Sequence, residues 1–470
     1  MTRKSKAAVF AELPPPVTDD WVSAIQVANR ERGDKVVILD DDPTGTQTVH
    51  DVMVLTTWDA AALTVAFEDV TPAVFILTNT RSMTAEQART VNREIAINLN
   101  AASKQTGRGF VVISRSDSTL RGHFPLETDV LAASVGGQVD GVLITPAFMA
   151  GGRYTINGVH YVAEDDALVP VAQTPFAQDA AFGYSASDLR EWVSEKTGGI
   201  VNAGDVATVM LDDIRTGGVD RVCEQLSALE NHTYCVVDAI TESDLEVVAL
   251  AAINAEAQGK RLLYRTAASF AAARAGIALR PLLTAEELRT ERSGGGLVVV
   301  GSYVPKSSSQ LAHLLEHTDI ERAEINVTRL LDDAAQADEI SRVVAHAGPL
   351  LRAGKTVVVY TSRELITGDD ATSSLSIGNR ISDSLVQITA QLQGAARFII
   401  AKGGITSSDL ATKALKARQA RVMGQILPGI PVWELDEDCA EPHLIYVVFP
   451  GNVGSVEAIA EAVAKLEGGA

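Results

Sequence analysis

The sequence contains few aromatic residues, few cysteines and no long apolar segment. Phe, Trp and Tyr make up 5% of the 470 residues, a fraction that disfavours the stacking surfaces with which proteins bind single-stranded nucleic acid. The three cysteines, Cys223, Cys235 and Cys439, provide neither a disulfide framework nor metal-ligand spacing. No apolar run approaches the length of a membrane span. These features predict a cytoplasmic protein without a nucleic-acid or membrane partner.

Positive charge is scarce relative to negative charge. The chain has 40 Lys and Arg residues against 60 Asp and Glu residues, for a formal net charge of −20. A field of this sign repels nucleic-acid backbones. An anionic ligand would therefore need a local positive site. Apolar residues make up 46% of the chain, so a large core can be buried.

Short apolar runs rich in β-branched residues recur along the chain, and a turn signal follows each run. Continuous runs of this length are typical of strands buried on both faces, as in parallel sheets covered by helices. Helical patterns lie between the runs, for example over residues 379–394 and after Ser455, which we expect to cap the last helix. The alternation predicts an α/β fold with Rossmann-like, mainly parallel sheets. We expect strands at residues 35–39, 73–78, 110–114, 141–145, 234–238, 261–264, 296–300, 356–360, 397–401 and 444–449.

A charged and then glycine-rich segment, "LRTERSGGG" at residues 288–296, indicates a domain boundary, with its glycines as linker. We predict an N-terminal extension and helix over residues 1–34, a first domain over residues 35–290 and a second over residues 297–470. The active-site cleft is expected between the two domains. Residues 149–199 show no clear pattern, and we expect long loops there.

Polar residues follow four predicted strands of the first domain, and in open α/β sheets ligands bind beyond the carboxyl ends of strands. "DDDPTGT" begins at Asp40, "RSDSTLRGH" begins at Arg115, and Arg81, Arg153 and His160 follow the other two strands. Arginines bind carboxylates in a bidentate manner, and an aspartate can accept a hydroxyl proton. This inventory predicts a site for a small hydroxylated anion.

Structural roles stay open for the same residues. Asp42-Pro43 could start a turn, Asp117 could cap a helix, and Arg121 could be a surface charge. Three aspartates in a row are not explained by one turn. His123 and His160 are more typical of hydrogen-bonded pocket or core residues than of metal ligands, because no paired-histidine spacing occurs.

Three predicted strands of the second domain end in loops rich in Gly, Ser and Thr, at residues 301–311, 402–415 and 450–459. Glycine lets the backbone approach a phosphate, and a helix N-terminus directs amide groups at it. The loops predict a nucleotide site, although the glycines could simply end strands and cap helices. Neither G-x-x-x-x-G-K-[ST] nor a G-x-G-x-x-G after a strand is present. A sugar acid in one domain and a nucleotide in the other suggest phosphoryl transfer.

Together these motifs resemble the four-carbon acid sugar kinase family, whose members phosphorylate acids such as threonate, erythronate and 3-oxo-tetronate. The resemblance covers about residues 35–465 and implies a sugar-binding N-terminal domain and an ATP-binding C-terminal domain. Pro43 and Thr46 depart from the Phe and Ala that are common in the family, which leaves room for a related branched acid. The matching segments are Asp41–Gly45, Asp117–Gly122, Gly301-Ser302, Gly403–Ser407 and Pro450–Gly454.

Strand-end position and resemblance together predict an ATP-dependent kinase that phosphorylates a hydroxyl of a small sugar acid, with Mg²⁺. Asp41 or Asp42 is expected to be the base or to orient the substrate. The expected substrate-binding residues are Thr44, Gly45, Arg81, Arg115, Asp117, Ser118, Arg121, Gly122 and His160. The expected ATP-binding residues are Ser302, Gly403, Gly404, Ile405, Thr406, Gly451 and Asn452. Metal ligands are not identified, and homo-oligomerisation stays open. An NAD-dependent hydroxy-acid dehydrogenase and a non-catalytic sugar-acid sensor are the alternatives.

Overall fold

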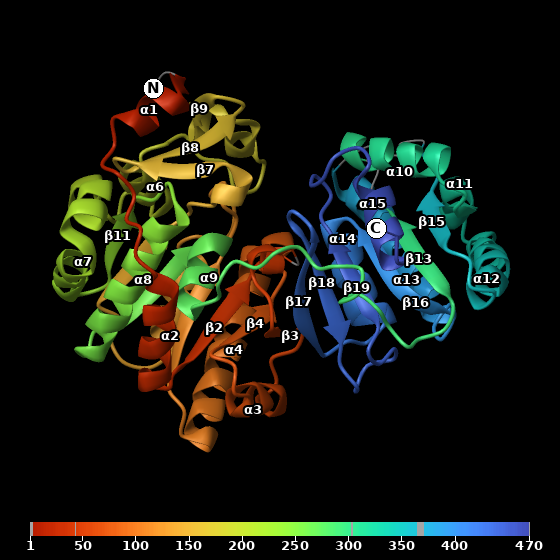
Figure 1. The fold of residues 1–470 in the computed structure, drawn as a ribbon, viewed down its shortest axis with the longest axis horizontal. Helices are drawn as coiled ribbons and strands as arrows, with labels where there is room; N and C mark the ends of the chain where they lie inside the picture. Colours follow the sequence, from red (N-terminus) through yellow and green to blue (C-terminus); the bar gives the residue numbers. More distant parts are fainter. Residues whose placement is uncertain (1–2, 43, 302–303, 364–370, 470) are drawn as a thin grey trace. The chain divides into compact units, whose positions relative to one another are not determined.

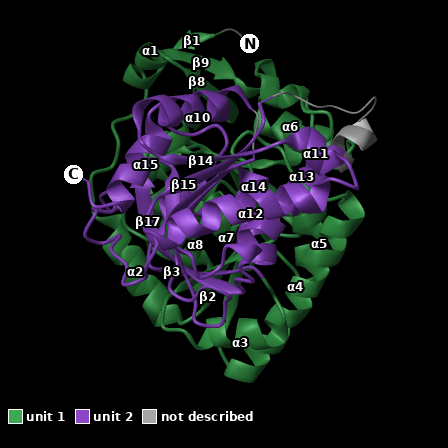
Figure 2. Cartoon of the chain, turned by 90° about the vertical axis from the view of Figure 1, so that its right-hand side faces the viewer, with its two compact units in different colours: residues 1–45, 57–279 green, residues 46–56, 280–470 purple. Residues whose placement is uncertain are grey.

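A computed structural model describes residues 3–42, 44–301, 304–363 and 371–469, without the side chains of residues 371–376. The chain forms two compact units (Figure 2). The first contains residues 1–45 and 57–279, and the second contains residues 46–56 and 280–470.

A parallel sheet forms the centre of the first unit (Figure 1). The order of its strands is β10-β11-β6-β12-β5-β2-β4. In chain order they are β2 (Lys35–Asp40), β4 (Ala73–Leu77), β5 (Phe110–Arg115), β6 (Gly141–Thr145), β10 (Ala207–Val209), β11 (Thr233–Val237) and β12 (Leu262–Thr266). Every residue of β2 is buried, as the continuous apolar run predicts.

Helices cover this sheet. They include α2 (Trp21–Arg32), α3 (Ala60–Glu68), α4 (Ala85–Thr106), α5 (Leu126–Ser134), α6 (Leu189–Lys196), α7 (Gly218–Ser227), α8 (Glu242–Ala257) and α9 (Ala268–Ala275). Helix α2 begins after Asp20, whose carboxylate accepts from the amide of Ser23, and ends at Gly33 in the left-handed conformation. Asn29 on α2 donates to the carbonyl of Arg274 on α9, so the N-terminal helix is tied to this unit.

The order in which the chain adds strands to the sheet reverses at β2. From β2 it passes to β4 on one side, and from β4 it crosses to β5 on the other side. This is the topological switch point of the sheet, the place where open α/β sheets bind ligands at their carboxyl edge. The register pairs Asp40 with Arg115 at that edge.

A second, antiparallel sheet in the first unit has the order β1-β9-β8-β7. Its strands are β1 (Lys4–Ser5), β7 (Arg153–Ile156), β8 (Val159–Glu164) and β9 (Ala167–Pro170). The expectation of long loops over residues 149–199 is therefore wrong for residues 153–170. Ile156 pairs with Val159 across Asn157-Gly158, and both turn residues have positive φ, as a two-residue hairpin requires.

The sheet of the second unit combines parallel and antiparallel strands in the order β3-β17-β18-β19-β16-β13-β15-β14. Strands β13 (Gly295–Val300), β14 (Glu321–Ile325), β15 (Val357–Thr361), β16 (Ala396–Lys402) and β19 (Ile445–Phe449) are parallel. Strands β17 (Gln419–Leu427) and β18 (Ile430–Leu435) form a hairpin, and β3 (Val52–Leu55) pairs with β17. From β13 the chain runs to β14 and β15 on one side and then to β16 on the other, a second switch point.

The helices of the second unit are α10 (Pro305–His317), α11 (Val327–Leu331), α12 (Gln336–Arg352), α13 (Ala371–Gln391), α14 (Gly404–Asp409) and α15 (Ala458–Leu466). The residue that precedes α15 is Glu457, so the expectation that Ser455 caps this helix is wrong. Gly295 and Gly296 lie within β13 and do not form a linker. A Cβ at Gly296 would stand 2.0 Å from the Phe398 ring, so this position requires glycine.

The α/β prediction is confirmed, and each of the ten predicted strands is present within one or two residues. The four residues Val36, Val37, Ile38 and Val298 illustrate the core: all are fully buried. Over the described part of the chain, no helix combines the length and the apolar composition needed to cross a membrane.

Candidate functional site

The carboxyl ends of β2 and β5 bring acidic and basic side chains together in the first unit. Asp40 ends β2 and Arg115 ends β5, and the loops that follow contain Asp41, Asp42 and Asp117. These five residues come from the two segments that the strand-end argument selects. The arrangement concentrates charge at a switch point of the sheet.

Asp40 is the residue that joins the two strand ends. Asp40 is 1% exposed, and its Oδ1 lies 3.0 Å from Nη1 of Arg115. Burial raises the pKa of Asp40 to about 7, although Arg115 opposes the shift. A Cβ at Gly45 would stand 1.9 Å from Oδ2 of Asp40, so glycine is required where the chain folds back over this carboxylate. Asp40, the first aspartate of the motif, thus has a role in holding the two strand ends together.

Asp41 is buried, but its carboxylate oxygens have no hydrogen-bond partner within the described residues. Oδ1 lies 3.9 Å from Nη1 of Arg81 and 3.8 Å from Nη1 of Arg115. Burial raises the pKa of Asp41, and the two arginines only partly oppose it. A buried carboxylate without hydrogen bonds is costly to a fold and marks a place where a ligand can supply the missing partners.

Asp42 differs from Asp41 because both of its carboxylate oxygens have partners. Oδ1 accepts hydrogen bonds from the amide of Thr44, at 2.9 Å, and from the Thr44 hydroxyl. Oδ2 forms an ion pair with Arg81. Burial alone would raise the pKa of Asp42, but Arg81 and Thr44 outweigh it and lower the pKa below the usual value. Of these two aspartates, Asp41 is therefore the one whose oxygens could accept hydrogen bonds from a ligand.

The loop after β5 is organised around Asp117. Its Oδ2 accepts hydrogen bonds from Nε of Arg121, at 2.7 Å, and from the Thr119 hydroxyl. Oδ1 lies 3.5 Å from Nη1 of Arg81. Burial opposes ionisation, but Arg81 and Arg121 lower the pKa of Asp117, so it is a fixed negative charge. Arg81 also pairs with Asp42 and therefore connects both acidic loops.

Gly122 brings the backbone of this loop against Asp41. Its φ is +121°, and a Cβ there would stand 3.3 Å from Oδ2 of Asp41. The lack of a side chain leaves the space next to the unpartnered carboxylate open. The predicted residues Asp41 and Gly122 are thus brought together, although 80 residues separate them in the chain.

His160 and Ser118 position the loop through its backbone. Nε2 of His160 lies 2.8 Å from the carbonyl of Ser118, and Nδ1 lies 3.0 Å from the Thr155 hydroxyl. Burial lowers the pKa of His160 to about 4, so the ring is neutral near pH 7. Both ring nitrogens have partners, so His160 acts through the loop to which it donates. The hydroxyl of Tyr184 donates to the carbonyl of Thr119 at 2.6 Å and supports the same loop.

Two site residues were missed by the sequence argument, Arg265 at the end of β12 and Glu127 on α5. Arg265 is 1% exposed, donates to the carbonyl of Arg121 and stacks 5.3 Å from the Trp192 ring. Burial raises the pKa of Glu127 to about 7, and Asp41 adds to the shift. The strand-end rule points to Arg265, because it directly follows the predicted strand at 261–264. No sequence signal distinguishes Glu127 from a surface residue of a helix.

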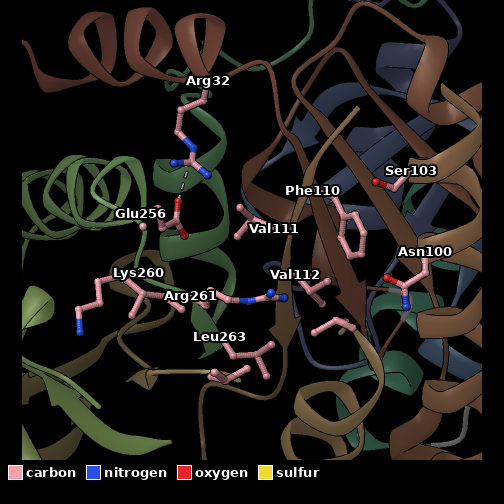
Figure 3. A pocket seen from close by; sticks show the side chains of 14 residues that line it. Arg32, Asn100, Ser103, Phe110, Val111, Val112, Glu256, Lys260, Arg261 and Leu263 are labelled. Atoms are coloured by element: carbon pink, nitrogen blue, oxygen red, sulfur yellow. Dashed lines mark ion pairs between the residues drawn. The ribbon is translucent and has the colours of Figure 1, made fainter. Parts of the chain in front are cut away.

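A separate pocket of about 430 Å³ lies at the opposite edge of the same sheet, where β5 and β12 begin (Figure 3). Arg32 and Glu256 face one another in it, with Nε and Oε2 4.0 Å apart. Lys260 and Arg261 also line it. None of the predicted site residues that the structure describes lines this pocket.

The glycine loops of the second unit lie at the carboxyl edge of its parallel strands. Gly403 has a φ of +114° and separates β16 from α14. Lys402, fully buried at the end of β16, donates from Nζ to the carbonyl of Pro450 at 2.6 Å and lies 4.1 Å from the Phe449 ring centre. The hydroxyl of Ser307 on α10 lies 3.3 Å from the carbonyl of Gly451. Contacts thus link the loops after β16 and β19 and the start of α10.

The predicted ATP-binding residues differ in exposure. Gly404, Ile405 and Thr406 form the start of α14; Ile405 is 68% exposed, whereas Thr406 is buried. No described atom lies within 4 Å of the position that a Cβ on Gly451 would take, and Asn452 is exposed. Ser302 lies outside the described residues, as does Pro43 of the acidic loop. Gly403 and Gly404 begin the segment that follows β16 directly, next to the switch point between β13 and β16.

Comparison with known proteins identifies two family models in the chain. A sugar-binding N-terminal domain matches residues 36–274, and a nucleotide-binding C-terminal domain matches residues 297–459. A 3-oxo-tetronate kinase of Pectobacterium atrosepticum is 29% identical over 385 residues, which are 78% of this chain and 83% of that protein. A D-threonate kinase of Cupriavidus necator is 28% identical over 344 residues, which are 72% of this chain and 75% of that protein.

The fold also matches a solved structure. A Haemophilus influenzae protein superposes with a TM-score of 0.64 at 20% sequence identity, and the match covers 91% of this chain and 98% of that one. At this identity the likeness concerns the fold alone. It agrees with the two α/β units described above.

Proposed function

Because the chain belongs to the four-carbon acid sugar kinase family, we propose that it transfers the γ-phosphoryl group of ATP to a hydroxyl of a small sugar acid. The observation that carries the proposal is the Asp41 carboxylate, which is buried at a switch point with neither oxygen hydrogen-bonded in the described residues. A substrate hydroxyl would supply the missing hydrogen bond. Carboxylates in this position orient acceptor hydroxyls in phosphoryl transfer.

Asp41 is the proposed general base. A substrate hydroxyl donates to one of its oxygens, and the proton passes to the carboxylate as the hydroxyl oxygen bonds to the γ-phosphorus and the bond to ADP breaks. The raised pKa of Asp41, caused first by burial, makes its carboxylate a better proton acceptor than an exposed aspartate. Asp42 is the less suitable candidate, because Arg81 and Thr44 occupy its oxygens.

The arginines and Asp117 are the proposed substrate-binding groups. Arg81 lies near Asp41, Asp42 and Asp117, and Arg121 pairs with Asp117. Cationic groups in this position offset the charge of an acidic substrate close to a carboxylate base. Thr44, Gly45, Ser118, Gly122 and His160 would shape the site through backbone and hydroxyl groups.

ATP is the proposed phosphoryl donor, held by the glycine loops of the second unit. Gly403, Gly404, Ile405, Thr406, Gly451 and Asn452 would contact it through backbone amides and polar side chains. Mg²⁺ would offset phosphate charge when bound. Asp41 would contact the ion through water, because direct coordination would compete with the proton that it accepts; its oxygens lack hydrogen-bond partners among the described residues, and bound Mg²⁺ usually keeps several waters.

The test is an ADP-release assay with Mg-ATP and a panel of four-carbon sugar acids and their branched relatives. D-threonate and 3-oxo-tetronate head the panel, because they are the substrates in the names of the two relatives. ADP release that depends on an acid would support the proposal. Acid binding in calorimetry without ADP release from any panel member would favour a sensor, and thermal stabilisation by NADH but not by ATP would favour a dehydrogenase. Either result would overturn the kinase proposal.

A further inference from the structure

The arginines around Asp117 are not equivalent. Arg81, Arg115 and Arg121 each lie within 4.0 Å of at least one carboxylate. Among the residues that the structure describes, no carboxylate lies within that distance of Arg153 or Arg265. Arg265 is fully buried under Trp192, whereas Arg153 is only partly buried at the start of β7. Arg153 is therefore the arginine with an uncompensated charge that an anion can approach from outside.

Arg153 is held next to the Asp117 loop by an aromatic ring. Its Cζ lies 5.8 Å from the ring centre of Phe176, and Cζ of Arg121 lies 5.2 Å from the same ring. Phe176 thus keeps the two guanidinium groups near one another despite their like charge. Burial lowers the pKa of Arg153 and Asp117 opposes that shift, which agrees with a position beside the Asp117 loop.

One edge of the Arg153 guanidinium lacks an acceptor. Nη1 donates to the carbonyl of Gly151, which fixes the orientation of the group. Nε is buried, and no described residue accepts a hydrogen bond from it. A buried donor without an acceptor is rare in folded proteins. The edge formed by Nε and Nη2 has the spacing with which arginine binds a carboxylate through two parallel hydrogen bonds.

We infer that Arg153 binds the carboxylate group of the acid substrate through this edge. The inference rests on the proposed function and deepens it, because it assigns the recognition of the acid group to one residue of the antiparallel sheet. Arg81 and Arg121 would then set the charge balance around Asp41 and Asp117, and Arg153 would distinguish an acid from a neutral polyol of the same length. Among the described residues the ion pairs of the proposed base Asp41 are with Arg81 and Arg115 and not with Arg153, so loss of Arg153 should weaken acid binding more than turnover at saturation.

Isothermal titration calorimetry on the full-length chain tests the inference without any need for turnover. The probes are threonate, erythronate and the neutral amide of each acid, and the variants are Arg153→Met and Arg153→Lys. Loss of two hydrogen bonds to a charged group should weaken binding of the acid roughly 10- to 100-fold in Arg153→Met. Lysine keeps the charge but not the paired donors, so Arg153→Lys should have an intermediate affinity. Binding of the amides should change little.

Arg3→Met is the matched control. Arg3 lies next to the same sheet, is largely exposed and pairs with Glu164, so its loss should leave acid binding unchanged. Circular dichroism and Tm values establish that each variant is folded, and Arg153→Lys serves as the test if Arg153→Met is not. The inference is overturned if the folded variants bind the acids within about 3-fold of the wild type, equivalent to less than about 0.7 kcal/mol. It is equally overturned if the wild type binds acid and amide equally. Absence of ADP release from a wild type that binds acids would instead contradict only the kinase proposal.

Discussion

Gly122 lies against Asp41, so that a Cβ on the glycine would stand 3.3 Å from Oδ2 of the aspartate. The glycine also has a φ of +121°, which other residues adopt only with strain. Gly122→Ala is expected to destabilise the protein by about 1–3 kcal/mol. It should also lower kcat/KM, because the methyl group enters the space beside the proposed base. Steady-state ADP release and urea unfolding measure the two effects.

Gly107→Ala is the control for Gly122→Ala: it adds a similar backbone strain without placing a methyl group beside Asp41. Gly107 has a φ of +72° at the end of α4, and no described atom lies within 4 Å of the position that a Cβ would take. The variant should lose a similar amount of stability and keep its kcat/KM. Equal losses of kcat/KM in both variants would show that the effect of Gly122→Ala is not local to the site.

Asp41→Asn should separate stability from activity. The wild-type carboxylate is buried without hydrogen bonds in the described residues, and burial raises its pKa, so its charge opposes folding near pH 7. The amide is expected to raise Tm slightly and to lower kcat by roughly 100- to 10,000-fold, the usual contribution of general acid–base catalysis.

Asp42→Asn should give the opposite pattern for stability. Its carboxylate accepts from Thr44 and pairs with Arg81, and its pKa is lowered, so replacement removes interactions that stabilise the fold. We expect a lower Tm and a smaller loss of kcat than in Asp41→Asn. A larger loss of kcat in Asp42→Asn would reverse the assignment of the base. Thermal melting and ADP release on both variants decide between the two aspartates.

Glu127→Gln should change how stability depends on pH. The pKa of Glu127 is raised from 4.5 to about 7, first by burial and then by Asp41. Because the folded state favours the protonated acid, the contribution of this group to stability is complete below about pH 4.5 and is lost as the pH rises through 7. The glutamine variant should therefore gain stability relative to the wild type, by up to about 1.4 kcal/mol per pH unit between about pH 5 and 7.

The measurement is urea unfolding at several pH values, and Glu68→Gln is the control. Glu68 is the last residue of α3 and is exposed, so its replacement should leave the pH dependence unchanged. A wild type and a Glu127→Gln variant with parallel pH profiles would show that Glu127 is ionised in the folded protein.

The sequence predicts the parallel strands well because each is buried on both faces and reads as one continuous apolar run. The antiparallel sheet of the first unit was not predicted, because its strands are short and differ in burial along their length. A signal was nevertheless present. Asn157-Gly158 stands between "RYTI" and "VHYVAE", and Asn-Gly between such runs is typical of a two-residue hairpin.

The strand-end rule selects the acidic loop and the Asp117 loop. Sequence spacing does not reveal which of the three adjacent aspartates has carboxylate oxygens without hydrogen-bond partners. That distinction depends on tertiary partners: Arg115 for Asp40, and Arg81 with Thr44 for Asp42. The same limit applies to Glu127, which lies on α5, an element that the linear pattern does not place beside the site. The strand-end rule does select Arg153, but the contacts that distinguish it from the other arginines depend on the fold.

Lys402→Met should weaken ATP binding without a loss of stability. Burial lowers the pKa of Lys402 from 10.5 to about 7, so the folded state disfavours the ammonium form. This opposition to folding grows as the pH falls from 10.5 to about 7 and is complete below that pH. Methionine removes that cost, and Tm at pH 6 should stay the same or rise. The carbonyl of Pro450 loses its donor in the variant, and the glycine loop after β19 is less well fixed. We therefore expect the Kd of ATP, measured by calorimetry, to rise roughly 10-fold.

Lys465→Met is the control for this last experiment, because Lys465 on α15 also donates from Nζ to a backbone carbonyl, that of Ile426, at 3.1 Å. It does not contact the loop after β19, so its replacement should leave ATP binding unchanged. If Lys402→Met binds ATP as tightly as the wild type, the Pro450 loop does not depend on the lysine. If both lysine variants lose affinity equally, the effect comes from the lost charge of the unit as a whole and not from the position of Lys402 at the end of β16.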